Sequence, residues 1–241
     1  MNKINLITES NTKILKSRKY GFSTYGIHLA PANLSGYNTC RSASIGCSKA
    51  CLNLAGHGVF KTVQQSRINK TLFFFKEREA FMQTLAKQIE SRIKSAKRKD
   101  LTPCFRPNLT SDLPYEKIKV KALNNLTIVE RFADLQFYDY TKVPARMSAF
   151  LAGDFPPNYH LTFSRNEELK NKKLCESFLK AGGNCAYVFR DSLPKTYRGI
   201  KVINGDESGL RFLDPTPCIV GLVEKGKAKQ DETGFVITDH I

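Results

Sequence analysis

The sequence predicts an α/β protein in which a mainly parallel sheet forms a full or partial (βα) barrel with a cysteine loop after its first strand. Short β-type runs alternate with longer segments of helical periodicity along most of the chain. Polar clusters follow the expected strands, as they do where parallel strands carry a site at their carboxyl ends. Three cysteines lie within twelve positions after the first expected strand. A doubly wound open sheet is the competing architecture.

Each element is predicted from its own pattern of apolar residues. The first strand is expected at 23–30, and the helical signal is clearest over 64–98, where Ile68, Leu72, Met82 and Leu85 share a three- and four-residue spacing. The other expected elements are strands at 101–107, 135–140, 159–164, 185–190, 199–204 and 218–223, and helices at about 115–123, 144–151 and 171–183.

Nothing in the sequence marks a domain boundary. No internal repeat, low-complexity tract or linker rich in Pro, Gly and Ser occurs, so we expect a single α/β domain over 1–241. No apolar run approaches the roughly 20 residues of a membrane span. The N-terminal stretch MNKINLITESNTK lacks the apolar core of a secretory signal, which favours a cytoplasmic protein.

The charge balance indicates a polyanionic partner. The chain has 38 Lys and Arg against 22 Asp and Glu, a net charge of +16 with a pI near 9.6. Such an excess is typical of proteins that bind nucleic acid, although a merely basic soluble surface is the alternative. An acidic membrane surface is a weaker candidate, because the basic residues are spread along the chain.

Polar residues after the expected strands are the candidate site. Carboxylates there are candidate catalytic groups: Asp112, Asp139, Asp206 and Glu207. Cationic and polar side chains there are candidates for binding substrate: Arg106, Asn108, Lys142, Ser164, Arg165, Arg190 and Arg211. The cations among them would contact phosphates, which positions a nucleic acid without reading its sequence. The alternative for any one such polar residue is that it caps a neighbouring helix.

The cysteine loop has the spacing C-x6-C-x3-C, and Cys40, Cys47 and Cys51 can converge on one soft metal. Zinc could take His57 as its fourth ligand, giving a closed structural site. A cubane iron–sulfur cluster held by three cysteines would instead leave one iron open to a cofactor. Packed thiols without metal are the third possibility. The other cysteines are expected to be buried structural thiols: Cys104, Cys175, Cys185 and Cys218.

Several motifs in order resemble a family of small phage proteins named after a mycobacteriophage gene product. They are the cysteine loop, the long helix, RPN-x-TSD at 106–112, YDYTK at 138–142, TFS at 162–164, NGDES-x-LRFLDP at 204–215 and VGL-x-x-KG at 220–226. The resemblance covers most of the chain. It implies a phage or phage-derived protein acting in the host cytoplasm, and it carries no established activity.

Two weaker similarities concern chemistry. The radical S-adenosylmethionine superfamily carries three cluster-binding cysteines in the loop after the first strand of a partial barrel, and Cys40, Cys47 and Cys51 match that location. Their spacing departs from the usual C-x3-C-x2-C of that superfamily. Barrel enzymes that exchange guanine for a modified base are similar in expected fold and charge, and this similarity implies Asp112 and Asp206 as acid and nucleophile.

Three functions follow as hypotheses. The first is a nucleic-acid-directed enzyme that modifies a base or nucleotide, with an iron–sulfur cluster and S-adenosylmethionine at the cysteine loop. The second is a metal-independent base transglycosylase with an Asp nucleophile and structural zinc. The third is a zinc-stabilised protein that binds nucleic acid without turnover.

Overall fold

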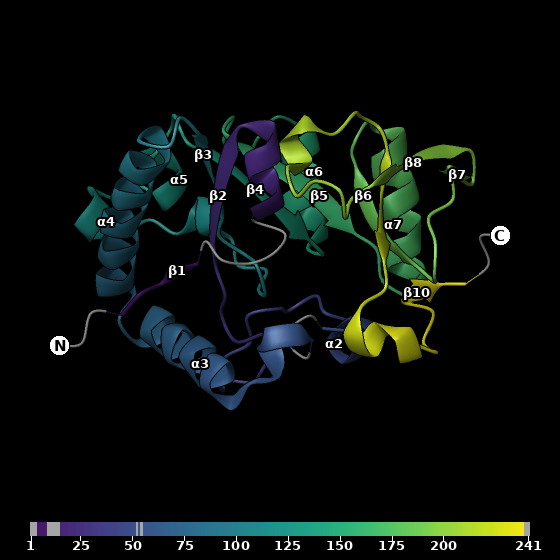
Figure 1. Ribbon diagram of the computed structural model, residues 1–241, viewed down its shortest axis with the longest axis horizontal. Coiled ribbons are helices and arrows are strands. Elements are labelled where there is room, and N and C mark those ends of the chain that lie inside the picture. The colour runs from purple at the N-terminus through teal and green to yellow at the C-terminus, as the bar shows by residue number, and fades with distance from the viewer. Residues whose placement is uncertain (1–3, 9–14, 52, 54, 239–241) are drawn as a thin grey trace. The chain divides into compact units, whose positions relative to one another are not determined.

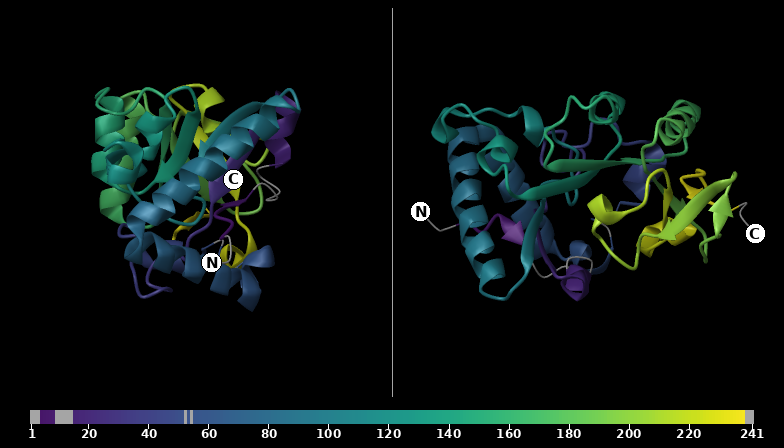
Figure 2. Two further views of the ribbon diagram at one scale, coloured as in Figure 1. Left: turned by 90° about the vertical axis from the view of Figure 1, so that its left-hand side faces the viewer. Right: turned by 90° about the horizontal axis from the view of Figure 1, so that it is seen from above.

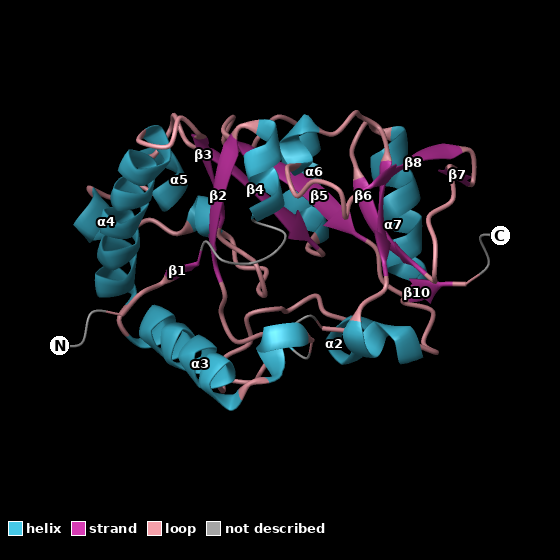
Figure 3. Ribbon diagram, in the orientation of Figure 1, coloured by secondary structure: helices cyan, strands magenta, loops and turns pink. Residues whose placement is uncertain are grey.

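The computed structural model describes residues 4–8, 15–51, 53 and 55–238, over which helices and strands alternate along the chain (Figures 1 and 3). The chain divides into two compact units. Unit 1 comprises Met1–Cys40, Lys61–Asp139 and Phe155–His160. Unit 2 comprises Arg41–Phe60, Tyr140–Asp154 and Leu161–Ile241.

In the described part of the chain, ten strands form one sheet in the order β1-β2-β3-β4-β5-β6-β9-β8-β7, with β10 also pairing with β6. The strands are β1 (Ile7–Thr8), β2 (Phe22–Ile27), β3 (Thr102–Arg106), β4 (Gln136–Thr141), β5 (Tyr159–Ser164), β6 (Cys185–Phe189), β7 (Thr196–Tyr197), β8 (Ile200–Asn204), β9 (Ile219–Val223) and β10 (Val236–Ile237). β1 and β7 pair antiparallel with their neighbours, whereas the pairs β2–β3, β3–β4, β5–β6, β6–β9, β8–β9 and β6–β10 are parallel.

The α/β class and the mainly parallel sheet are therefore confirmed, but a barrel is not. Strands β2 to β6 lie side by side in chain order, as in a βα barrel. The order then changes, since β9 lies next to β6 and β8 lies outside β9. The path of paired strands ends at β1 and at β7, as in an open sheet.

The helices connect the strands as βα units require. They are α2 (Ile45–Lys49), α3 (Lys61–Lys76), α4 (Arg78–Lys97), α5 (Ile128–Arg131), α6 (Pro144–Leu151) and α7 (Leu169–Lys180). Short 3-10 turns are η1 (Ser17–Tyr20), η3 (Gly56–Val59), η4 (Tyr115–Lys117), η5 (Lys121–Leu123), η6 (Arg211–Leu213) and η7 (Gly226–Gln230).

The helix predicted over 64–98 is two helices, because the chain leaves helical geometry at Glu77, where φ is −133° and ψ is 55°. The break brings the end of α3 against the start of α4. The Phe74 ring packs edge-on against Phe81 at a centroid distance of 5.2 Å, and the Arg78 guanidinium lies 4.2 Å from the centre of the Phe74 ring. One straight helix would keep the Phe74 and Phe81 rings about two turns apart, whereas Phe74 and Arg78 would be neighbours in either case. The apolar spacing continues through the break, so it could not reveal it.

A second difference concerns 115–123, predicted as one helix. The structure has two short turns there, η4 and η5, and Val120 between them is extended. The following helix α5 was not predicted. It starts with a reciprocal capping box, in which the Thr127 side chain accepts from the Glu130 N–H and the Glu130 carboxylate accepts from the Thr127 N–H.

The core of unit 1 lies beneath α4, which crosses the strands and packs against β1 and β3 (Figure 2). Its buried face carries Phe81, Met82, Leu85 and Ile89, at the three- and four-residue spacing expected of an amphipathic helix. This packing holds the parallel pair β2 and β3 in place, so that their carboxyl ends lie together.

In unit 2, helix α7 packs against α6 and β6 (Figure 2). β5 pairs with Cys185 and Ala186 of β6, while β10 pairs with Val188 and Phe189. Tyr187 lies between these two pairings, so the edge of β6 is shared by two strands that meet near it.

No helix in the described ranges is long and apolar enough to cross a membrane.

The absence of a side chain at Gly26 should be needed for the close approach of β2 to β3. A Cβ at this position would lie 2.6 Å from the Arg106 carbonyl oxygen and 2.8 Å from Leu109 Cδ1. We expect Gly26→Ala to lower the free energy of unfolding by about 1–3 kcal/mol, measured by denaturant titration. Thr102→Ala, at an exposed position of β3, is the control and should change it by less than about 0.5 kcal/mol. Equal stability of the two variants would contradict the close approach.

Candidate functional site

Asp139, one of the predicted catalytic carboxylates, is completely buried in β4. Its Oδ1 accepts a hydrogen bond from the Asn108 N–H at 3.1 Å, and its Oδ2 accepts from Asn108 Nδ2 at 2.8 Å and from the Tyr159 hydroxyl at 2.6 Å. A buried carboxylate needs such donors, because burial without them would be very costly. Asp139 thus fixes the start of the loop that follows β3.

Asn108, held by Asp139, in turn forms hydrogen bonds to the rest of that loop. Its side-chain oxygen accepts from the Ser111 hydroxyl at 2.7 Å and from the Leu113 N–H at 2.9 Å. The Asp112 N–H donates to the Thr39 carbonyl at 2.8 Å. Two more predicted site residues, Asn108 and Asp112, therefore lie in a loop tied both to β4 and to the segment that carries Cys40.

Three cationic side chains and one histidine lie together at the carboxyl ends of β2 and β3. We name this group the strand-end basic cluster, and its members are His28, Arg67, Lys70 and Arg106. The register pairs Arg106 with Gly26, two residues before His28, so the Arg106 and His28 side chains lie on the same face. His28 Nδ1 lies 3.5 Å from Thr110 Oγ1. This places the cluster against the loop that Asp139 and Asn108 hold.

Helix α3 supplies the other two cations of the cluster. Thr71 anchors α3 to the segment after β2, since its hydroxyl accepts from the Ala30 N–H at 2.8 Å and donates to the Arg67 carbonyl at 2.9 Å. Arg67 is buried, and the half-buried Lys70 donates to the Leu6 carbonyl at 3.1 Å. Both side chains are thereby held near the strand ends.

The electrostatics of this cluster favour an anion. Burial, and then the charges of Arg67, Lys70 and Arg106, together lower the pKa of His28 from 6.5 to about 3. His28 is therefore neutral near pH 7. Burial, and then Arg67, also lower the pKa of Lys70. Cations held this close repel one another, and an anion bound among them would relieve that repulsion.

Of the cluster, sequence reasoning found Arg106 and missed His28, Arg67 and Lys70. The helical pattern gave no signal for them, because the predicted apolar stripe runs through Ile68 and Leu72. Arg67, Thr71 and Phe74 lie at four- and three-residue spacing and are all buried in α3. A cation on the buried face of a helix is rare unless polar groups pair with it.

In unit 2, the structure brings together Lys142, Ser164 and Arg165 of the predicted substrate-binding set. Lys142 Nζ donates to the Ser164 hydroxyl at 2.6 Å and lies 5.7 Å from the centre of the Phe235 ring. Arg165 is buried and donates from Nη1 to the carbonyls of Gly234 and Phe235, each at 3.1 Å. All three therefore surround the segment that leads into β10.

Two other predicted residues of unit 2 join loops to one another. Arg190 donates from Nη2 to the Asp231 carbonyl at 2.8 Å and from Nη1 to the Lys229 carbonyl. Asp206 accepts from the Val223 N–H at 3.0 Å and forms an ion pair with Lys225. These contacts fix the turn after β8 to the end of β9. Glu207, the next residue, is exposed.

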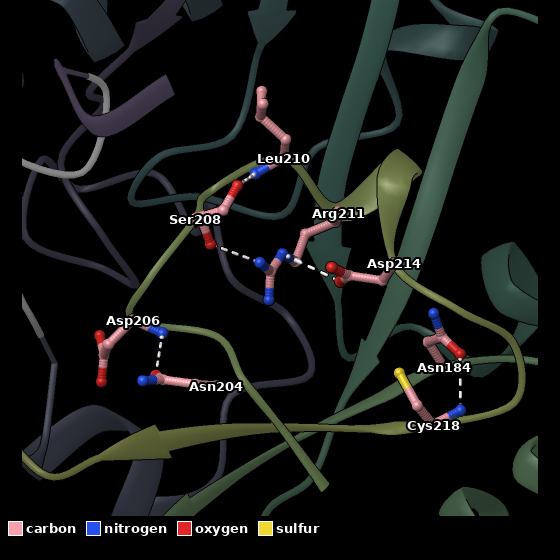
Figure 4. Close-up of polar contacts among 8 residues, drawn as sticks. All are labelled: Asn184, Asn204, Asp206, Ser208, Leu210, Arg211, Asp214 and Cys218. Carbon is pink, nitrogen blue, oxygen red and sulfur yellow. Dashed lines mark hydrogen bonds and ion pairs between the residues drawn. The ribbon is translucent and has the colours of Figure 1, made fainter. Parts of the chain in front are cut away.

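Arg211 is buried in the turn that follows Asp206 (Figure 4). Its Nε lies 3.2 Å from Asp214 Oδ2, and its Nη2 donates to the Ser208 carbonyl. A Cβ on residue 205 would lie 2.9 Å from Nη1, so a glycine there leaves space for the guanidinium. Burial raises the pKa of Asp214 to about 6, against the opposing effect of Arg211. The Arg211 guanidinium is thus paired inside the protein, with the Asp214 carboxylate and the Ser208 carbonyl.

The cysteine-bearing segment of unit 2 is held by one carboxylate. Glu167, which follows β5, accepts from the Ser44 hydroxyl at 2.7 Å and from the Gly46 N–H at 2.8 Å. Burial alone would raise the pKa of Glu167, but these hydrogen bonds outweigh it and the pKa is lowered. Cys47, in α2, packs against a small apolar cluster that includes Phe235. Helix α2 is therefore anchored to the loops after β5 and before β10.

The predicted metal ligands are divided between the units: Cys40 belongs to unit 1, and Cys47, Cys51 and His57 belong to unit 2. Neither unit by itself supplies the three-sulfur set. Over the described residues, no group of three or more His, Cys, Asp or Glu side chains is arranged to hold a metal ion. Convergence of the three sulfurs therefore stays a prediction.

The other four cysteines, Cys104, Cys175, Cys185 and Cys218, are completely buried, as predicted. Cys104 Sγ lies 3.1 Å from the Thr24 hydroxyl, which in turn lies 3.2 Å from the Tyr138 hydroxyl. Burial raises the pKa of the Cys104 thiol to about 12, so the thiol stays protonated and weakly reactive.

Comparison with known proteins identifies a family. The family model described as Gene product 88 matches residues 5–239. The chain belongs to this family. The match confirms the resemblance to a phage gene-product family, whereas similarity to the radical S-adenosylmethionine superfamily is not shown. No curated protein and no solved structure showed a significant match.

Asp139 should be more important for stability than a solvated catalytic acid would be. We expect Asp139→Asn to lower the free energy of unfolding by at least about 2 kcal/mol, because its amide group would face donors and leave buried groups unpaired. Thermal and denaturant unfolding measure this. Asp134→Asn, at an exposed position just before β4, is the control and should stay within about 0.5 kcal/mol of the wild type. A fully stable Asp139→Asn variant would contradict the structural role.

Glu167 should make stability depend on pH. Because its pKa is lower in the folded state, the unfolded state binds more protons in acid, and the stabilisation is lost as the pH falls below the ordinary glutamate value of about 4.3. The stability difference between wild type and Glu167→Gln should therefore be larger at pH 7 than at pH 3.5–4, measured by denaturant titration at both. A difference that does not change with pH would show that the carboxylate charge is unimportant.

Proposed function

We propose that this protein binds nucleic acid and that the strand-end basic cluster of unit 1 contacts a backbone phosphate. The observation that carries the proposal is the gathering of Arg67, Lys70 and Arg106 around a neutral His28. Phosphate oxygens accept charge-assisted hydrogen bonds from such side chains, and Arg can present two donors at once.

The position of the cluster supports the same proposal. It lies at the carboxyl ends of β2 and β3, the edge where parallel sheets commonly bind ligands. Its loop side is preorganised by the Asp139–Asn108 hydrogen bonds. The net charge of +16, from 38 basic and 22 acidic residues, would add a long-range attraction for a polyanion.

We propose binding only, and both DNA and RNA are candidate ligands. Modification of a base or nucleotide, by iron–sulfur and S-adenosylmethionine chemistry or by an Asp nucleophile, remains a hypothesis from the sequence. Zinc at the cysteine segment likewise remains one. Iron, sulfide and zinc analysis of protein purified without oxygen separates these readings, and neither phosphate binding nor its test depends on the outcome.

Lys70 should account for one phosphate contact. Binding of a labelled oligonucleotide, as single-stranded DNA, duplex DNA and RNA, is measured by fluorescence anisotropy between about 50 and 200 mM salt. Lys70→Gln should weaken binding and reduce the slope of log K against log salt by about 0.7–0.9, because one fewer counterion is released.

The matched control for this experiment is Lys76→Gln, an exposed position in the last turn of the same helix α3. It should leave the slope close to that of the wild type. Equal slopes for Lys70→Gln and the wild type would refute the phosphate contact. Absence of salt-dependent binding to all three nucleic acids would refute nucleic-acid binding itself.

A further inference from the structure

Unit 2 contains a cavity of about 190 Å³ that none of the sites described above uses. Its walls come from β6, β7, α7, β10 and the residue that follows β5. Six of its lining side chains are aromatic or charged: Arg165, Lys172, Glu176, Tyr187, Tyr197 and Arg198.

The cavity exists because two strands share one edge of β6. β5 ends at Ser164, whose partner is Ala186, and β10 begins opposite Val188. Tyr187 lies between these two pairings and is one of the residues that line the cavity. Arg165 also lines it, with its guanidinium fixed on the Gly234 and Phe235 carbonyls.

Two tyrosine rings and two guanidinium groups line this cavity. The Tyr187 and Tyr197 rings meet edge to face, with centroids 5.9 Å apart and planes at 70°. The Arg165 guanidinium lies 5.6 Å from the centre of the Tyr187 ring, and that of Arg198 lies 5.6 Å from the centre of the Tyr197 ring. Aromatic rings and Arg planes together are the surfaces on which nucleobases stack.

The charge of the lining favours an anion. Arg165, Lys172 and Arg198 are cationic, against one carboxylate, Glu176. Glu176 pairs with Arg198 at 2.9 Å, and both side chains are about half exposed or more, so this ion pair adds little to stability and can rearrange around a ligand. Lys172 and Arg198 are thus available to hold a phosphate at the mouth of the cavity.

We propose that this cavity binds a nucleoside monophosphate, with its base against Tyr187 and Tyr197 and its phosphate on Lys172 and Arg198. The volume is smaller than the roughly 300–1,000 Å³ of pockets that enclose drug-sized ligands, so the cavity would hold the base alone and the phosphate would lie at its mouth. The site shares no residue with the strand-end basic cluster and does not depend on that cluster binding nucleic acid.

The experiment is calorimetric titration of the full chain with adenosine, guanosine, cytidine and uridine 5′-monophosphates, and separately with the nucleosides and inorganic phosphate. At least one monophosphate should bind more tightly than its nucleoside and than phosphate alone. Tyr197→Leu should weaken this binding about tenfold or more, whereas Tyr197→Phe, which keeps the ring, should stay within about threefold of the wild type.

Lys172→Gln tests the phosphate contact. It should weaken binding of the monophosphate about tenfold and leave binding of the nucleoside unchanged. Lys173→Gln is the matched control, because Lys173 is exposed on the same helix and does not line the cavity. It should bind like the wild type.

Three results would overturn the proposal: no monophosphate binding at millimolar concentration, inorganic phosphate binding as tightly as the monophosphates, or no effect of Tyr197→Leu.

Discussion

The cost of burying charge governs the strand ends of both units. Asp139 is completely buried in unit 1 and is stabilised by three donors, two from Asn108 and one from Tyr159. Arg165 is the corresponding buried cation in unit 2, and it donates to two backbone carbonyls. Because an unpaired buried charge is very unfavourable, each group holds its partners in one arrangement. The loops that carry the candidate sites are therefore preorganised.

This constraint separates two kinds of polar residue at the strand ends. Asp139, Arg190 and Asp206 use their hydrogen-bonding capacity on neighbouring loops, so their contacts are those of positioning residues. Lys70 and Lys172 differ from them, since each projects from a helix toward a site built by strands and loops. Lys70 and Lys172 would thus contact ligands, while Asp139, Arg190 and Asp206 hold the neighbouring loops in position.

Much of the fold could be predicted because the signals are local. The apolar run at Tyr159–Ser164 and the proline that starts α6 at Pro144 each mark one element in a short window. β1, β7 and β10 are two residues long, too short to show a period. The break at Glu77 brings Phe74 against Phe81, a contact between two helices that the helical spacing does not encode.

The candidate sites were predicted in part for the same reason. Parallel strands carry sites at their carboxyl ends, and this strand-end rule selected Arg106, Asn108 and Arg165 from sequence position alone. It could not tell a positioning residue from one left for a ligand, because that depends on partners distant in the chain, such as Tyr159 for Asp139.

The rule also could not find side chains that reach a strand end from a helix. Arg67 lies on the same helical face as Thr71 and Phe74, and Lys172 lies on α7. The apolar spacing assigned the neighbouring face of α3, through Ile68 and Leu72, to core packing. The structure instead buries Arg67, Thr71 and Phe74 and leaves Ile68 and Leu72 half-buried. Burying a cation costs free energy unless polar groups surround it. Because the apolar stripe marks a different face of α3, it gave no sign that Arg67 is buried.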